Sequence, residues 1–245
     1  MFVGHYGPAY AAKATSKRLP LWLLFFAVQF LDIMWSILVL LGVEKLRIVH
    51  GFTASSALDL YYMPYTHGVI GALFLSAVLG CISEMFFRQK GKTFLIVALC
   101  VFSHWVLDLI VHVPDLPLIG NTMKVGFGLW QHRTIALILE FATLFAGIWI
   151  YVLRVRSQSK SGNIWLWSVS AAMVIIQLCT VFGIDPTSSK MEAISALTAY
   201  LLFIFLAGVI DRMRTEQSGP KKAEMPLPTA TAPPHGATGM QRTNN

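Results

Sequence analysis

The chain has 245 residues, of which 56% are hydrophobic and only 13% are charged, and its formal net charge is +7. This composition is typical of a protein with several membrane-spanning segments and excludes a soluble globular domain. The basic side chains lie in loops, without a basic face interleaved with aromatic residues, so we expect a lipid bilayer and not nucleic acid as the partner.

Hydrophobic runs divide the chain into three parts. Residues 1–19 form a short amphipathic lead, residues 20–211 a transmembrane helical bundle, and residues 212–245 a Pro-, Thr- and Ala-rich tail that we expect to be disordered. Six runs are long enough to cross a bilayer as helices, at 21–43, 65–87, 93–113, 134–153, 164–184 and 191–210. The sequence therefore predicts an all-α fold, a polytopic membrane bundle of about six helices.

The distribution of lysine and arginine predicts the orientation of this bundle. With six spans, 14 basic side chains fall on the side that holds both termini and 5 fall on the opposite side. Basic residues are enriched in cytoplasmic loops of membrane proteins. We therefore expect both termini in the cytoplasm.

The third span carries three ionisable side chains on one stripe. His104, Asp108 and His112 stand at positions i, i+4 and i+8, so they point within roughly 80° of one another on a helix. Ionisable groups are costly in hydrocarbon and need an interior partner, which would be a metal ion, a proton path or each other. A His–Asp hydrogen bond that holds helices together is the alternative interpretation.

Other spans place polar groups at a similar depth. Counted at about 1.5 Å per residue from the ends of the spans, six residues fall between the midplane and the outer face. They are Asp32, His67, His104, Asp108, His112 and Glu140. Four spans thus contribute to one polar layer, which is the strongest functional signal in the chain.

Imidazole and carboxylate groups together suit a divalent metal ion, with zinc as the first candidate and manganese or iron as others. A catalytic zinc has three protein ligands and one open position, where it lowers the pKa of a bound water towards neutrality. A spare carboxylate, such as Glu140 or Asp59, would orient a ligand histidine or act as general base. Asp32, His67, His104, Asp108 and His112 are the candidate ligands.

Four short motifs occur in order along the first half of the chain. They read Gly4-His5, Leu31-Asp32, Thr66-His67-Gly68 and Ser103-His104-Trp105-Val106-Leu107-Asp108. This set resembles the bacterial inner-membrane family of membrane-bound metal-dependent hydrolases, which is grouped by pattern with zinc-dependent phospholipase C and P1 nuclease. Gly128-Leu129-Trp130 and Glu140 match a further element of some members. The resemblance implies a zinc-dependent hydrolase of the inner membrane, a lipid phosphoester as substrate, and His5 as an additional ligand.

The chain also departs from the family pattern. Met34 and Trp35 stand where a second Asp and a His often follow the first acid, and Tyr62 and Gly68 replace a usual His and Ser. One or two metal ions, or a site that has been lost, are therefore expected in place of a larger cluster. His5 also conflicts with the predicted topology, which starts the chain in the cytoplasm, away from the polar layer.

Two functions from different classes remain open at this point. The first is a metal-dependent hydrolase, which requires a water-accessible pocket beside the metal ligands. The second is a permease-like or structural membrane protein whose buried His and Asp groups relay protons or hold helices together. Transport requires a path that reaches both faces of the membrane.

Overall fold

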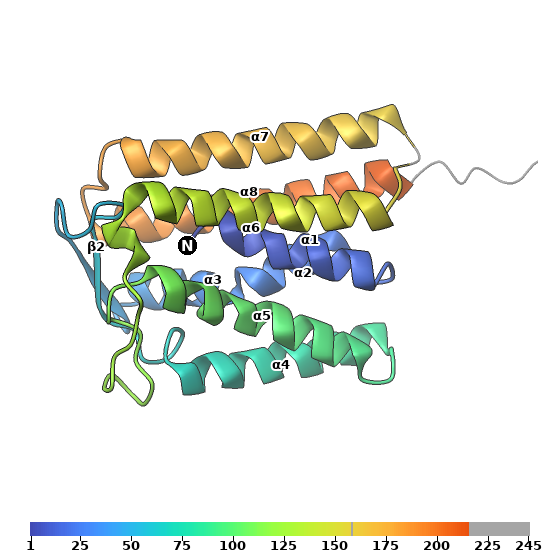
Figure 1. Cartoon of the computed structure of the whole chain (residues 1–245). Coiled ribbons are helices and arrows are strands. Elements are labelled where there is room, and N and C mark those ends of the chain that lie inside the picture. The colour runs from blue at the N-terminus through green and yellow to red at the C-terminus, as the bar shows by residue number, and fades with distance from the viewer. Residues whose placement is uncertain (158, 216–245) are drawn as a thin grey trace, which may run out of the picture.

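A computed structural model describes residues 1–157 and 159–215 and shows a bundle of helices aligned along one direction (Figure 1). The helices are η1 (Val3–His5), α1 (Tyr6–Thr15), α2 (Leu21–Val28), α3 (Phe30–Leu40), α4 (Val69–Phe87), α5 (Lys92–Val111), η2 (Leu129–Gln131), α6 (Arg133–Arg154), α7 (Lys160–Phe182) and α8 (Ser189–Thr215). The predicted helical membrane bundle is confirmed. The predicted tail begins inside α8, and its remainder lies outside the described residues.

The long helices coincide with the predicted spans. Among the described residues, α4 to α8 are each long and apolar enough to cross a membrane, and the pair α2 and α3 makes a sixth span if the two are counted as one. They expose large apolar side chains such as Phe74, Phe86 and Trp149, as a surface in contact with lipid does. These are the helices of a multi-pass membrane protein, whereas the orientation and the inner membrane remain predictions.

The first span is broken at Gln29, which the sequence did not reveal. The axes of α2 and α3 differ by 55°, and Gln29 between them has a backbone conformation outside the helical region. Its buried side chain donates a hydrogen bond from Nε2 to the carbonyl of Phe2 at 3.3 Å. The break places Asp32 in the first turn of α3, where the helix dipole favours a negative charge.

Residues 1–19, predicted as an amphipathic lead, are folded into the bundle. η1 and α1 pack against α2, α5 and α6, with Val3, Tyr6 and Tyr10 fully buried. Figure 1 shows the N-terminus inside the bundle and not at either end. This arrangement brings His5 to the level of the polar layer, which removes the conflict between its motif and the topology.

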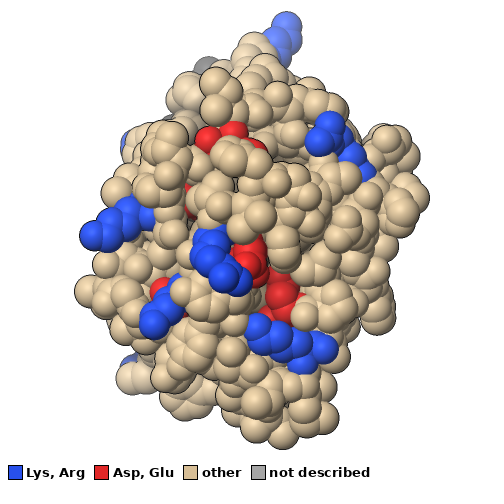
Figure 2. Space-filling view, turned by 90° about the vertical axis from the view of Figure 1, so that its left-hand side faces the viewer, with Lys and Arg blue, Asp and Glu red and all other residues tan. Residues whose placement is uncertain are grey.

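A small hairpin covers one end of the bundle. The predicted polar loop contains β1 (Lys45–Ile48) and β2 (Leu58–Tyr62), which pair in antiparallel fashion. We call this the hairpin end. Seen from there, lysine and arginine side chains surround acidic ones (Figure 2), and Arg47 is paired with Asp59 across the two strands.

Candidate metal centre

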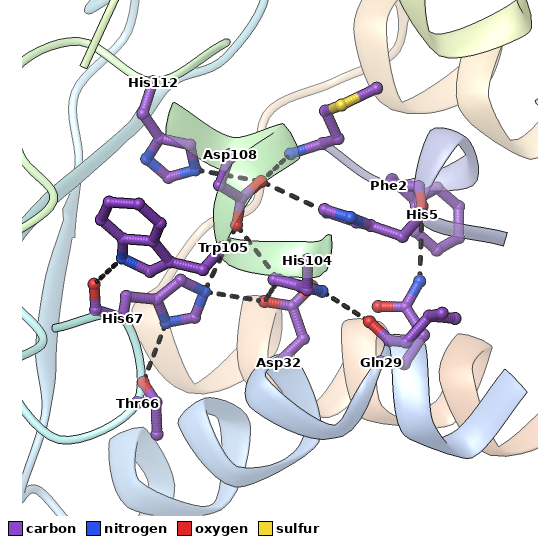
Figure 3. Close-up of polar contacts among 12 residues, drawn as sticks. Phe2, His5, Gln29, Asp32, Thr66, His67, His104, Trp105, Asp108 and His112 are labelled. Carbon is purple, nitrogen blue, oxygen red and sulfur yellow. Dashed lines mark hydrogen bonds and ion pairs between the residues drawn. The ribbon is translucent and has the colours of Figure 1, made fainter. Parts of the chain in front are cut away.

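Side chains from four parts of the chain meet inside the bundle near the hairpin end (Figure 3). α5 supplies His104 and Asp108, and α3 supplies Asp32. His67 comes from the turn before α4, and His5 from η1. All five are buried, and His5 and His104 have no exposed surface. The structure thus brings together residues that the sequence placed in one polar layer.

Two sets of three side chains have ligand atoms that all lie within 4.8 Å of one another, namely Asp32, His67 and His104, and His5, His104 and Asp108. The carboxylate–imidazole distances around His67 and His104 are close to those between ligands of one metal ion. Asp32 Oδ1 lies 3.2 Å from His67 Nε2 and 3.3 Å from His104 Nε2. Asp108 Oδ2 lies 3.0 Å from His104 Nε2 and 3.6 Å from His67 Nε2. Ligands of tetrahedral zinc at bond lengths of about 2.1 Å are about 3.4 Å apart. We call these four residues the central quartet.

The other oxygen of Asp108 faces a second set of nitrogen atoms. Oδ1 lies 2.6 Å from the α-amino group of Met1, 3.2 Å from His5 Nε2 and 3.7 Å from His112 Nε2. The ring of His5 stacks on that of His104 at 3.7 Å, and neither of its nitrogens has a hydrogen-bond partner among the described residues. Asp108 therefore lies between two groups of candidate ligands.

Each of three histidines is held through Nδ1 by an acceptor. His104 Nδ1 lies 2.7 Å from the carbonyl of Val28, and His112 Nδ1 lies 2.9 Å from Asp115 Oδ1. A carbonyl or carboxylate can only accept a hydrogen bond, so each Nδ1 carries the hydrogen, and when the ring is neutral its Nε2 presents a lone pair. Histidines that bind metals are oriented in this way by groups behind them.

Glu44 provides the corresponding support for His67, and sequence reasoning missed it. Its buried carboxylate accepts hydrogen bonds from the hydroxyl of Thr66 at 2.6 Å and from the backbone N–H of Thr66 at 3.0 Å. Because Thr66 donates its only hydroxyl hydrogen to Glu44, its oxygen accepts from His67 Nδ1 at 2.8 Å. The available signal was a carboxylate 23 residues before the motif histidine His67, but the position of Glu44 in a loop did not indicate its depth in the membrane.

The pKa values of His67 and His5, which both lie outside the membrane-spanning helices, are shifted in opposite directions. Burial lowers the pKa of His67, but hydrogen bonds to Asp108 and Asp32 outweigh burial and raise the pKa to about 10. Burial and the neighbouring His104 lower the pKa of His5 to about 3, so its ring is neutral. Asp32 and Asp108 therefore favour a positive charge beside Nε2 of His67, where a metal ion would replace the proton.

The two candidate catalytic carboxylates have other partners, although Glu140 lines the cavity beside the centre. Glu140 on α6 accepts hydrogen bonds from the backbone N–H of Phe2 at 2.9 Å and of Gly4 at 2.7 Å, and so holds the N-terminal segment in place. Asp59 lies on the hairpin and pairs with Arg47 at 2.6 Å. Neither carboxylate makes an ion pair with the central quartet among the described residues.

A cavity of about 250 Å³ reaches the centre from the hairpin end. Asp32, His67, Asp108 and His112 form its polar wall. Residues of α6, α7 and α8 form the opposite wall, in which apolar side chains alternate with polar ones. The carboxylates of the centre are therefore accessible to a ligand or to water, as hydrolysis requires.

Comparison of the chain with protein-family models, with curated proteins and with solved structures finds no match. The resemblance to membrane-bound hydrolases thus remains a prediction from motifs, and function has to be argued from the geometry.

Proposed function

We propose that this chain is a membrane-embedded, metal-dependent hydrolase of lipid phosphoesters. The observation that carries the proposal is the central quartet, in which each carboxylate has one oxygen 3.0–3.6 Å from Nε2 of both histidines. Asp32 and Asp108 are both buried. Two buried carboxylates are costly unless their charges are compensated, and a divalent metal ion between them would compensate both.

The donor set fits zinc or a similar divalent ion. Two imidazoles and two carboxylates are found in zinc, manganese and iron sites, and such an ion would supply Lewis-acid activation of water and of the phosphoryl oxygens. In this proposal the central quartet holds the ion. Tyr200 donates a hydrogen bond to Asp32 Oδ2 at 2.8 Å, which keeps Oδ1 of the same carboxylate turned to the centre.

His112 is suited to accept the proton that the attacking water loses. Its Nε2 lies 3.7 Å from Asp108 Oδ1, its ring lies 4.1 Å from that of Trp130, and it lines the cavity. Asp115 accepts from its Nδ1 and would stabilise the imidazolium that forms. The pair would thus work as a general base with an orienting carboxylate, while Asp108 stays in contact with the ion.

The extent of the cavity supports a hydrolase over a permease. Its lining residues belong to the centre and to the half of the bundle near the hairpin end. A second, shallower pocket at the opposite end is lined by residues such as Glu84 and Arg88 and shares no lining residue with the first. A permease needs a continuous path, and these two pockets do not join into one.

The proposal is tested by phosphoester hydrolysis in lipid nanodiscs that contain radiolabelled phosphatidylglycerol. We expect the wild type to release water-soluble label only with divalent metal present. His112→Asn should lower kcat by about 100-fold or more, since general acid–base catalysis contributes that much, while metal content is retained. His132→Asn, an exposed residue, is the control. Release that is unaffected by chelator or by His112→Asn would overturn the proposal.

A further inference from the structure

The cavity beside the centre has two chemically different walls. One wall is the polar centre itself, and the other, on three helices, combines apolar side chains with polar ones such as Glu140 and Glu192. The apolar side chains are Ala136, Leu137, Ile176, Val181, Ala196 and Ala199. Such a shape suits an amphiphile, with its polar part at the metal ligands and its chain against α6, α7 and α8.

The part of the cavity between α7 and α8 reaches the surface of the bundle. α7 packs along α8 rather than along α6 (Figure 1). Thr180 on α7 and Ser195 on α8 both line the cavity and are exposed. Because both helices are membrane spans, a molecule can enter here from within the bilayer.

The depth of the site matches the position of a lipid phosphoester. Asp108 lies three residues before the end of α5, and Thr180 lies two residues before the end of α7. At 1.5 Å per residue, both stand within about 5 Å of the helix ends, where headgroups meet acyl chains. The exposed Lys45, Arg133 and Lys190 at the same end would attract an anionic headgroup.

A buried amide inside the cavity points to a specific ligand. Gln177 lines the cavity, is only 5% exposed, and its Oε1 has no hydrogen-bond partner among the described residues. A buried carbonyl oxygen that receives no hydrogen bond lowers the stability of the fold. A ligand that brings a hydroxyl or N–H donor part-way along its length would satisfy this acceptor.

From these observations we infer that the α6–α7–α8 wall is the acyl-chain site for a bilayer phospholipid that enters sideways. Its phosphoester lies at the centre, and a hydroxyl or amine of its headgroup donates a hydrogen bond to Gln177 Oε1. This inference rests on the proposed function for the role of the bound lipid, but the binding site itself needs no metal.

Photo-crosslinking tests the site in nanodiscs of phosphatidylglycerol that include a phosphatidylglycerol with a diazirine on one acyl chain. The wild type should crosslink at cavity-lining residues of α7 and α8, as read by peptide mass spectrometry. Ala196→Trp should reduce that yield about tenfold or more by filling the cavity. Ile194→Trp, on the exposed face of the same helix, is the matched control and should leave the yield unchanged.

Two further variants keep the result interpretable. Gln177→Leu removes the acceptor with little change of volume and should also lower the yield at cavity residues. His104→Ala should lose metal but retain crosslinking, which separates the lipid site from the hydrolase proposal. Crosslinks that lie only on exposed side chains, or a cavity yield equal in the Ala196→Trp and Ile194→Trp proteins, would overturn the inference even if metal is bound.

Discussion

At the scale of single residues, the candidate centre depends on groups behind the histidines as much as on the histidines themselves. Val28, Thr66 and Asp115 each accept a hydrogen bond from one ring, and all three rings turn Nε2 towards the carboxylates. The helical period of the third span was enough to predict that His104 and Asp108 share a face. The supporting groups could not be predicted, because they come from positions distant in sequence.

Glu44 offers a test of this support. Glu44→Gln keeps the shape of the side chain, but its amide group can donate a hydrogen bond to the Thr66 hydroxyl. The Thr66 oxygen would then no longer be required to accept the hydrogen bond from His67 Nδ1. We expect metal affinity to fall by about 10- to 100-fold, as for other groups that orient metal ligands. Competition with a coloured chelator measures the affinity. Asp59→Asn, on the exposed hairpin, is the control, and equal affinity of the two variants would refute the role of Glu44.

At the scale of elements, two interruptions of regular structure build the site. The break at Gln29 turns Asp32 inwards, and the folded N-terminal segment brings His5 alongside His104. Hydrophobicity predicted where the spans lie, since length and composition decide that. It could not predict the break or the buried N-terminus, because both depend on tertiary contacts such as those of Gln29 with Phe2 and of Glu140 with Gly4.

The packing of α1 on α6 makes a prediction about Gly7. A Cβ atom at residue 7 would collide with the backbone carbonyl of Thr143. Gly7→Ala should therefore destabilise the protein by about 1–3 kcal/mol, the usual cost of overpacking. Thermal unfolding in detergent measures the effect. Gly208→Ala, whose Cβ would meet Trp22 at an ordinary 3.8 Å, should change little, and equal stability of the two variants would contradict the packing account.

At the scale of the whole molecule, an apolar bundle encloses a buried polar centre that opens to a cavity near one end. Six apolar spans made the fold class predictable, and the shared depth of Asp32, His67, His104 and Asp108 made most of the centre predictable. Glu140 was expected at this depth, and it lines the same cavity while it holds the N-terminal segment. Asp59 was named only as a spare carboxylate, and it pairs with Arg47 on the hairpin. Depth alone does not distinguish a side chain in the centre from one that supports a neighbouring segment.

Metal content tests the central claim most directly. Protein purified without chelator should contain about one zinc or similar ion per chain. The His104→Ala and Asp108→Ala proteins should each retain only a small part of this metal. His132→Ala should retain it. Chelation should lower the thermal stability of the wild type and leave the His104→Ala protein unchanged, because an ion that binds the native state stabilises it. Wild-type protein that is free of metal and whose unfolding is indifferent to added zinc would contradict the account.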